Sequence, residues 1–452
     1  MNIKDDFILS QINEGYLVGG SVRDTLMDKS FVDRDIAING AEVFAKKMAE
    51  KFGATFIVLD PEYKIYRLVL EDKINYLDIS EIQGANIEED LERRDFAMNA
   101  IAIDLSNYEI IDPYCGQKDI EKRIIRHIKD SNFEEDPLRI LRAFRFASTT
   151  GFDISEETKN CIKNYKHLLL NPAKERINYE LMKLFGGGKC SKVLLEMDEY
   201  GILEELFSCV KEMKKVTPNT HHHLDLFHHV VETVRNIEEL YSGVGDVEKE
   251  HLDSIDFGGF PRINHLKLAG FLHDIGKFST WTIEVTGRHR FIKHDDVGAK
   301  MCVPYLREMK FSKKQIEYIS SMIKNHIYPS NVIDAPDLNE KVKMRYLRKM
   351  EENVIDNIIL AKADRLSARG EAITEEMVKT NLEGLDKLLD FYLEKKETLK
   401  PLPKLLDGIE IMKIKGIKQS PELGKIINAL KEAQLNGDIS TKKEAIEFLK
   451  TI

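Results

Sequence analysis

The stretch YLVGGSVRDTLM (16–27), followed by DRDIAI (33–38), decides the fold of the first part of the chain. A short apolar run ends at Gly19–Gly20, a polar segment with helical spacing follows, and a second apolar run begins after Asp33 and Asp35. Side chains two residues apart on a strand point to the same face, so these two carboxylates can bind the same divalent metal ions. The order of strand, Gly-Gly turn, helix and strand therefore predicts an α/β unit with a phosphate and metal site.

The composition narrows the class of protein. A chain of 452 residues is too long for one hydrophobic core, which predicts roughly two to four domains. A formal net charge of −10 argues against non-specific coating of nucleic acid, because phosphate contacts need positive charge. We find no apolar run near the ~18 residues of a membrane span and no secretory signal pattern. The five scattered cysteines form no CxxC pair, which predicts a cytoplasmic protein without a disulfide framework.

The pattern of apolar residues changes near residue 126. Before it, FIVLD, YRLVL and NYLDIS read as strands, AEVFAKKMAEKFG as a helix ending at a glycine, and IAIDL with EIIDP as a hairpin. After it, nearly every segment has helical spacing. This predicts an α/β head, a helical neck, a helical domain and a helical tail, with expected limits of 1–125, 126–195, 196–395 and 396–452.

The carboxylates of DRDIAI suit phosphoryl or nucleotidyl transfer. Two Mg²⁺ ions need hard oxygen ligands on a rigid element, and Asp33 and Asp35 provide them. Asp78 in NYLDIS, on a neighbouring strand, is the candidate third carboxylate. Gly19–Gly20 let backbone N–H groups approach a phosphate, and Arg23 would then face a triphosphate. The alternatives are an ordinary turn and a solvated pair of carboxylates.

Several motifs together resemble the polymerase-β-type nucleotidyltransferases, in particular the family of class II tRNA nucleotidyltransferases and bacterial poly(A) polymerases. The resemblance rests on LVGGSVRD and DRDIAI, and on motifs that follow in the family's order: RRDFAMNAIAID (93–104), DPYCGQKDIEKRIIR (112–126), EEDPLRILRAFRFA (134–147) and KERINYEL (174–181). It spans residues 16 to about 185 and implies a polymerase-β-type head with a helical neck.

The segment EEDPLRILRAFRFA carries the residues that would select the base. Asp136 and Arg139 are three positions apart, and we expect them, with Glu135, on one helix. An accepting aspartate and a donating arginine match the Watson–Crick edges of cytosine and adenine, at roughly 1–3 kcal/mol per pairing by analogy with base readout in duplexes. The resemblance implies this role and places Arg142 beside the nucleotide. The alternative is a helix cap or an interhelical salt bridge.

The segment RRDFAMNA would hold the rest of the nucleotide. The resemblance implies that Arg93 and Arg94 contact the base or the triphosphate. It also implies that Asp95 and Asn99, four apart on an expected helix, bind the ribose 2′-hydroxyl. The alternative for Arg94 and Asp95 is a helix cap with an ion pair.

The resemblance implies an enzyme that adds C, A or both to a tRNA 3′ end from CTP and ATP with Mg²⁺. Many CCA-adding relatives carry a flexible polar and basic loop before RRDF, whereas this region reads YLDISEIQGANIEEDLE, short and acidic. That loop is tied to the switch from C to A addition, so addition of CCA, of CC only and of A only all stay open. A poly(A) polymerase acting on other RNAs is the main alternative.

A second site is predicted in the helical domain. The segments DLFHHVVETV (225–234), FLHDIGK (271–277), FIKHDDVGAKM (291–301), IKNHIYP (323–329) and ILAKADRL (359–366) resemble the HD superfamily of metal-dependent phosphohydrolases. The implied metal ligands are His229 (with His228 the less favoured choice), His273, Asp274, His294, His326 and Asp364. Imidazole and carboxylate ligands suit Mn²⁺, Fe²⁺, Ni²⁺ or Mg²⁺.

This ligand set predicts hydrolysis of a phosphate ester. A bound metal lowers the pKa of a coordinated water, and Lys277 would steady the phosphate. The resemblance implies 2′,3′-cyclic phosphates or phosphomonoesters as substrates. The histidine run 221–223 either lines this site or caps a helix, and we assign it no role. A different class, an HD hydrolase whose head only binds RNA, is disfavoured because the two aspartates of DRD are intact.

The tail resembles the C-terminal piece of HD-bearing members of the nucleotidyltransferase family. In its segment GIKQSPELGK (416–425), the backbone N–H groups with Lys418 and Lys425 would clamp an RNA backbone. The alternative of equal weight is a small helical packing module. The sequence does not indicate an oligomeric state.

Overall fold

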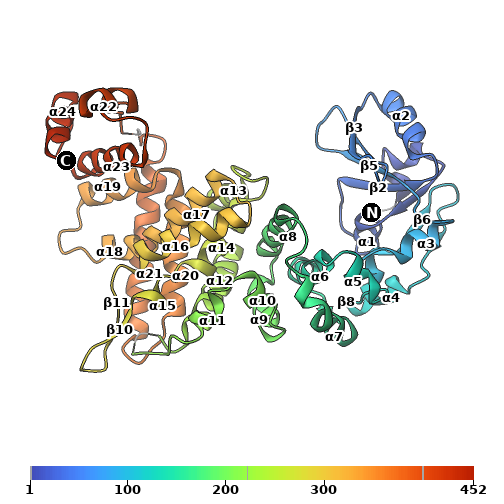
Figure 1. Ribbon diagram of the computed structural model, residues 1–452, viewed down its shortest axis with the longest axis horizontal. Coiled ribbons are helices and arrows are strands. Elements are labelled where there is room, and N and C mark those ends of the chain that lie inside the picture. The colour runs from blue at the N-terminus through green and yellow to red at the C-terminus, as the bar shows by residue number, and fades with distance from the viewer. Residues whose placement is uncertain (1–2, 221, 400–401) are drawn as a thin grey trace. The chain divides into compact units, whose positions relative to one another are not determined.

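The computed structural model describes residues 3–220, 222–399 and 402–452. The chain divides into two compact units, Met1–Ser208 and Cys209–Ile452. Figure 1 shows the strands of the large sheet in the N-terminal part of the chain and mostly helices after it. The predicted α/β head and helical remainder are therefore confirmed, whereas the four domain limits stay predictions. In the described part of the chain, no helix has the length and apolar character needed to cross a membrane.

A mixed sheet of seven strands forms the centre of the first unit, in the order β3–β4–β5–β2–β1–β6–β7. The strands are β1 (Tyr16–Val18), β2 (Asp33–Ile38), β3 (Thr55–Asp60), β4 (Ile65–Val69), β5 (Tyr76–Glu81), β6 (Ala102–Asp104) and β7 (Ile110–Ile111). Neighbours are antiparallel except β2 and β5, which run parallel. The strands expected at FIVLD, YRLVL and NYLDIS and the expected hairpin are confirmed.

Alternation along β2 separates the core from the site. Arg34 is buried, and its guanidinium donates to the buried Asp6 carboxylate with an Nη2–Oδ2 distance of 2.6 Å and to Asn75 Oδ1 at 3.0 Å. Asp33 and Asp35 lie on the other, less buried side of the strand. The buried ion pair thus fixes β2 on its core-facing side. The Asp33 and Asp35 side chains lie on the opposite, less buried face of the strand.

Helices follow the strands and continue into the neck. They are α1 (Gly20–Leu26), α2 (Ala41–Phe52), α3 (Ile87–Glu92), α4 (Gly116–Lys122), α5 (Ser131–Glu135), α6 (Leu138–Thr150), α7 (Glu156–Tyr165), α8 (Lys174–Gly186), α9 (Cys190–Glu199) and α10 (Ile202–Leu206). Two short strands, β8 (Ile124–Ile125) and β9 (Asp153–Ile154), pair in parallel within the otherwise helical neck. The α2 helix ends at Gly53 in the left-handed conformation, as predicted.

Two expected helices are wrong in detail. Asp136 does not share a helix with Arg139, because it lies between α5 and α6 with extended φ and ψ of −139° and 91°. Pro137 accounts for this break, since proline disfavours helical geometry in the preceding residue. Asp95 likewise lies before a short 3₁₀ turn, Ala97–Asn99, and the intervening residue is extended.

The second unit is built from helices around one fully buried helix. All eleven residues of α14 (Arg262–Leu272) are buried, and this helix packs against α12, α17 and α20. The helices are α11 (Val210–Met213), α12 (Leu226–Gly243), α13 (Asp246–Asp253), α15 (Lys277–Thr280), α16 (His294–Glu308), α17 (Lys313–Asn325), α18 (Tyr328–Ile333), α19 (Glu340–Met350), α20 (Val354–Ser367) and α21 (Glu375–Lys395). A hairpin that the sequence analysis missed, β10 (Trp281–Ile283) and β11 (His289–Phe291), precedes α16.

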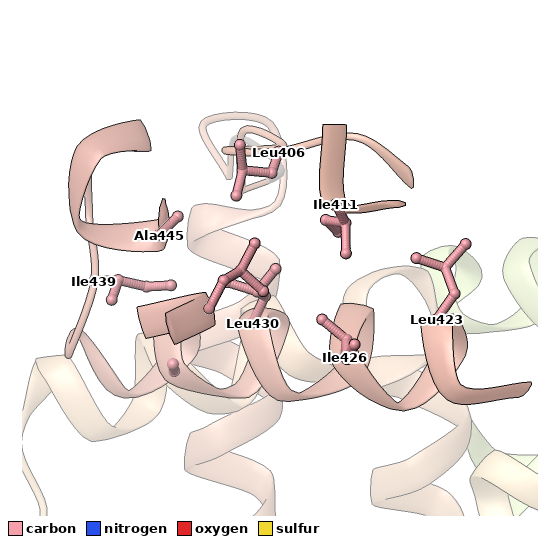
Figure 2. Close-up of a cluster of buried hydrophobic side chains, with 9 residues drawn as sticks. Leu406, Ile411, Leu423, Ile426, Leu430, Ile439 and Ala445 are labelled. Carbon is pink, nitrogen blue, oxygen red and sulfur yellow. The ribbon is translucent and has the colours of Figure 1, made fainter. Parts of the chain in front are cut away.

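The tail forms three short helices with a small apolar core. They are α22 (Gly408–Lys415), α23 (Pro421–Asn436) and α24 (Lys442–Thr451). Figure 2 shows Ile411, Ile426 and Leu430 within the cluster of buried side chains between them. Lys418 and Lys425 are both exposed. A packing module and an RNA contact are thus compatible, and the RNA contact stays a prediction.

Two candidate active sites

The three predicted carboxylates of the head meet at adjacent strands. Asp35 on β2 is directly opposite Asp78 on β5, and Asp33 is two residues before Asp35 on the same face. Gly19 has a φ of 72° and a ψ of −135°. A Cβ at Gly19 would lie 3.2 Å from Asp35 Oδ2, so the Gly-Gly turn passes directly beside the carboxylates.

The charge at this point of the head suits divalent cations. Burial, together with the negative charges of Asp78 and Asp33, raises the pKa of Asp35 to about 6, against the opposing charges of Arg94 and Arg67. Carboxylates that repel one another at a partly buried position are stabilised when a cation comes between them. The donor set is made of hard oxygen atoms and therefore fits Mg²⁺.

The third carboxylate is not a free ligand. The Arg67 guanidinium donates two hydrogen bonds to Asp78, each 2.7 Å long, from the neighbouring strand β4. This fork geometry is among the strong forms of charge pairing. Asp78 is therefore less available to a metal ion than Asp35, and the metal-ligand roles of all three carboxylates stay predictions.

The predicted nucleotide-binding residues come together around one cavity of about 700 Å³. Its lining includes Gly19, Gly20, Arg23, Asp35, Asp78, Arg93, Arg94, Asp95, Asn99, Asp136, Arg139 and Arg142. Arg145 and Lys183 also line it and were missed by the sequence analysis. Arg145 follows Arg142 by three positions on α6, and this helical spacing was the signal that could have identified it.

Asp95 is the centre of a hydrogen-bond network beneath the cavity. One carboxylate oxygen accepts from Asn99 Nδ2 at 2.9 Å and from the Phe96 N–H at 2.8 Å, and the other accepts from Arg142 Nε at 2.8 Å. Although burial raises it, the charge of Arg142 and these hydrogen bonds lower the pKa of Asp95 to about 2. Both oxygens are already engaged, so the geometry gives Asp95 a positioning role more directly than a ribose contact.

The same network continues along both neck helices. The Arg142 Nη1 lies 3.3 Å from Glu180 Oε1 on α8, and Arg145 Nε donates to the other Glu180 oxygen at 2.8 Å. On the opposite side, Arg23 Nη1 donates to Asn99 Oδ1 at 2.9 Å while Nη2 pairs with Asp24 at 2.8 Å. The cavity wall is therefore held by charged contacts that join the head to α6 and α8.

The two predicted base-reading residues are each held by other groups. Arg139 donates to the backbone carbonyls of Asn132 at 2.7 Å and Arg93 at 2.5 Å. Asp136 accepts from Arg176 on α8 at 2.8 Å, the interhelical salt bridge named as the alternative. Because the Arg176 side chain is 53% exposed, this pair is weak, of the order of 0–1 kcal/mol.

The predicted HD residues converge on Asp274 in the second unit. Asp274 Oδ2 lies 3.2 Å from His229 Nε2 and 3.3 Å from His273 Nε2. Its other oxygen lies 3.2 Å from His294 Nε2 and 3.5 Å from His326 Nε2. Asp364 Oδ1 completes the first group at 3.2 Å from His229 Nε2. The result is two groups of ligands that share one carboxylate.

The donor atoms of this site fit divalent metal ions. His229 Nε2, His273 Nε2 and Asp274 Oδ1 are buried and lack a hydrogen-bond partner among the described residues. Unpaired buried polar atoms are costly, and cations bound by the two groups would satisfy them.

The ring orientations agree with this assignment. The Nδ1 atoms of His273, His294 and His326 lie 2.7–2.8 Å from backbone carbonyls. A ring that donates from Nδ1 turns the lone pair of Nε2 toward the site. Gly276 helps to bring α16 close, since a Cβ there would lie 2.0 Å from the His294 carbonyl oxygen.

Two histidines differ from the sequence-based expectation. His228 is exposed and paired with Asp225 at 2.6 Å, so the less favoured alternative is excluded as a ligand. His222, which received no role, lies 3.3 Å from Lys277 Nζ and packs edge-on against His229 with ring centroids 4.6 Å apart. Burial and the Lys277 charge lower the pKa of His222 to about 2, so its ring is neutral. His221 lies outside the described residues.

A cavity of about 740 Å³ adjoins the HD ligands. Lys277, His294, His326 and Asp364 face it, as does Arg365. Lys277 Nζ lies 2.5 Å from Asp274 Oδ2, and this ion pair holds the lysine ammonium group beside the candidate metal ligands. The geometry is compatible with the predicted phosphate contact of Lys277.

The fold and both sites define a class of protein in which an α/β head with a nucleotide cavity precedes an HD-type metal centre. Comparison of the sequence with protein families finds matching domains in the same order along the chain. Residues 15–126 match the poly A polymerase head domain, residues 151–214 the probable RNA and SrmB-binding site of polymerase A, and residues 226–369 the HD domain.

Curated relatives extend over nearly the whole chain. The A-adding tRNA nucleotidyltransferase of Deinococcus radiodurans is 29% identical, covering 96% of this chain and 94% of the relative. The CC-adding tRNA nucleotidyltransferase of Thermus thermophilus is 28% identical, with 98% and 95% coverage. The Thermotoga maritima CCA-adding enzyme, solved in complex with tRNA, has the same fold at 21% identity, a TM-score of 0.55, and 98% and 92% coverage. The chain thus contains a poly A polymerase head domain, a segment that matches an RNA-binding site of polymerase A and an HD domain, and it is similar to tRNA nucleotidyltransferases over nearly its whole length.

Proposed function

We propose that this protein is a template-independent tRNA nucleotidyltransferase that adds C, A or both to a tRNA 3′ end. The RNA 3′-hydroxyl attacks the α-phosphate of CTP or ATP, and pyrophosphate leaves. The observation that carries the proposal is the single cavity in which all the predicted nucleotide-binding residues adjoin the Asp35 carboxylate. The tRNA-acting relatives that cover nearly the whole chain support tRNA over other RNAs as the substrate.

Each part of the head site has a proposed task. Asp33 and Asp35 would hold Mg²⁺, which supplies neutralisation of the charge on the reacting phosphates. The Gly19–Gly20 turn lets the backbone approach the triphosphate, and Arg23 offers positive charge beside it. The Asp95–Arg142 pair keeps the wall rigid, which limits reorganisation when the nucleotide binds.

The extent of addition depends on the segment between β5 and α3. Residues 82–86 form this connection, and two of its N–H groups are pinned, Gln83 to Asp90 at 3.0 Å and Ala85 to Glu89 at 2.8 Å. A short connection held by these hydrogen bonds has little freedom to change conformation between the addition of C and the addition of A. The relatives that add only CC or only A make partial addition a specific possibility for this chain.

Primer extension tests the proposal. One tRNA transcript ending before CCA, after C, or after CC is incubated with CTP, ATP and Mg²⁺. Extension by C or A on any of the three supports the function, and the pattern assigns full, CC-only or A-only addition. Long adenylate tails on unrelated RNA would change the assignment to poly(A) polymerase. Absence of any incorporation would refute the proposed nucleotidyltransferase activity.

A second activity, hydrolysis of phosphate esters, is proposed for the HD site. It is supported by the buried donor atoms of His229, His273 and Asp274, which lack partners among the described residues and suit Mn²⁺, Fe²⁺, Ni²⁺ or Mg²⁺. Phosphate release from 2′,3′-cyclic phosphates and phosphomonoesters should survive Asp35→Ala and disappear in Asp364→Ala. Equal loss in both variants would argue against an independent second site. A cytoplasmic location completes the proposal and is supported by five free cysteines.

A further inference from the structure

A third group of metal-ligand side chains lies in the neck, outside both candidate active sites. His127 follows β8, Asp130 immediately precedes α5, and Cys161 lies on α7. One ligand atom from each residue lies within 4.8 Å of the other two. His127 and Cys161 are buried, whereas the Asp130 side chain is 65% exposed. Two of the three candidate ligands are therefore buried, and the third is at the protein surface.

The present contacts of this trio centre on the carboxylate. His127 Nε2 lies 2.7 Å from Asp130 Oδ1, and the Cys161 thiol also donates to Asp130. Burial, with the adjacent negative charge, raises the pKa of Cys161 to about 12, so the thiol is protonated at neutral pH. The carboxylate thus holds two hydrogen atoms at the position that a single cation could occupy.

We propose that His127, Asp130 and Cys161 bind one thiophilic divalent cation, of which Zn²⁺ is the type. Imidazole nitrogen, carboxylate oxygen and thiolate sulfur are the three donors that Zn²⁺ takes in proteins, and water from the exposed side would complete a tetrahedron. Glu157, four residues before Cys161 on α7, adds negative charge nearby.

The hydrogen-bond network allows the ring to serve as a ligand. His127 Nδ1 lies 2.9 Å from Thr158 Oγ1, which in turn lies 2.9 Å from Ser155 Oγ. Thr158 Oγ1 accepts from Ser155 Oγ and from the His127 N–H. When the imidazole proton is on Nδ1, it faces Thr158 Oγ1, and the Nε2 lone pair is free. When a cation replaces the Nε2 contact with Asp130, the imidazole proton moves to Nδ1, where Thr158 Oγ1 is its partner, which is the tautomer that metal ligation needs. Binding of one cation therefore releases one proton, which comes from the Cys161 thiol.

A cation at this point would join two separate segments. Its helical ligand comes from α7, whereas the His127 main chain forms a β-bridge with Phe96, next to Asp95 of the nucleotide cavity. The site would therefore cross-link the neck helix α7 to the chain segment that supports the cavity. We infer a structural rather than catalytic role for it.

Titration of the full chain with Co²⁺ tests the proposal, because a cobalt–thiolate bond gives a charge-transfer absorption band. The predicted ligands in the head and HD sites contain no sulfur, so this band reports the neck site even when the other sites are filled. We expect the band to saturate at one cation, with release of one proton, and to compete with Zn²⁺. It should disappear in Cys161→Ser and persist in Cys115→Ser, which removes an exposed thiol elsewhere.

A second variant at the protein surface keeps the test valid if the buried substitution Cys161→Ser disturbs folding. Asp130→Asn changes an exposed side chain and should weaken Co²⁺ binding at least tenfold while leaving the circular dichroism spectrum unchanged. Absence of the band in the wild-type protein would overturn the proposal and leave the trio as a hydrogen-bonded structural contact. A band that persists in Cys161→Ser, or that vanishes in Cys115→Ser, would also overturn it.

Discussion

Replacing Gly19 with alanine tests whether the conformation of the Gly-Gly turn controls the position of Asp35, the proposed metal ligand. A Cβ at this position would lie 3.1 Å from Arg94 Nη1 and 3.2 Å from Asp35 Oδ2. Both distances are shorter than ordinary van der Waals contact, so the two side chains must move by a few tenths of an ångström. The backbone is strained as well, because a φ of 72° with a ψ of −135° is a conformation that alanine rarely adopts.

The expected magnitude has two parts. Backbone strain should lower the stability of the head by about 1–3 kcal/mol. Displacement of Asp35 should lower kcat/KM for nucleotide addition by about 10- to 100-fold, since a misplacement of 1 Å at a reacting centre can cost about 100-fold. This loss corresponds to ~1.4–2.8 kcal/mol of transition-state stabilisation.

The chain offers a matched control at Gly40. Its φ of 75° is nearly the same, but nothing lies within 4 Å of the position of its Cβ. Gly40→Ala should therefore cost about 1–2 kcal/mol in stability through its left-handed backbone, with addition kinetics within about twofold of wild type.

Single-turnover addition to a tRNA primer measures the first effect, and hydrogen exchange of the amides in β1 and β2 measures the stability of the head. The single tryptophan, Trp281, lies in the second unit, so its fluorescence serves as an internal standard for that unit. Addition by Gly19→Ala within threefold of wild type, or an equal loss in Gly40→Ala, would refute the link between the turn and Asp35.

Three further outcomes are expected. Asp274→Asn removes the carboxylate shared by both HD ligand groups, so it should abolish retention of metal after dialysis and lower phosphohydrolysis about 100-fold or more, with nucleotide addition unchanged as the control. Because the pKa of Asp35 is raised to about 6, its carboxylate takes up a proton as the pH falls through 6, and Mg²⁺ affinity of the head measured by calorimetry should fall roughly tenfold per pH unit below that value; a flat profile from pH 7 to 5 would contradict this. Asp136→Ala should reduce the preference for C and A over U and G by about 1–3 kcal/mol in competition assays, whereas Glu135→Gln, outside the cavity, should not.

Local patterns in the sequence were sufficient for the architecture and for most of the residues that the structure brings together in both candidate sites. The order of strand, Gly-Gly turn, helix and paired aspartates fixed Asp33 and Asp35 on one face, because side chains alternate along any strand. The candidate HD ligands were predicted from their order in the chain, and the structure brings His229, His273, Asp274 and Asp364 together. Helix ends with a local cause were also readable, such as the left-handed Gly53 after α2.

The errors arose where a local signal was overlooked or overruled. Pro137 breaks the expected helix between Asp136 and Arg139, and its effect on the preceding residue was available in the sequence. His222 carried no periodic signal of its own. Its place beside Lys277 follows from the path of the chain before α12, which the packing of the second unit decides.

The partners of the charged residues were decided only by the tertiary structure. Arg67 meets Asp78 through the register of β4 and β5, and Arg142 meets Asp95 across 47 positions of sequence. Cys161 reaches His127 only because α7 packs beside α5. Sequence periods describe which face of an element a side chain occupies, over one or two turns or a few strand residues. Distances between remote side chains depend on strand register and helix packing, which the whole core fixes at once. The sequence therefore determined which residues are candidate ligands, and the fold determined which side chains lie beside them.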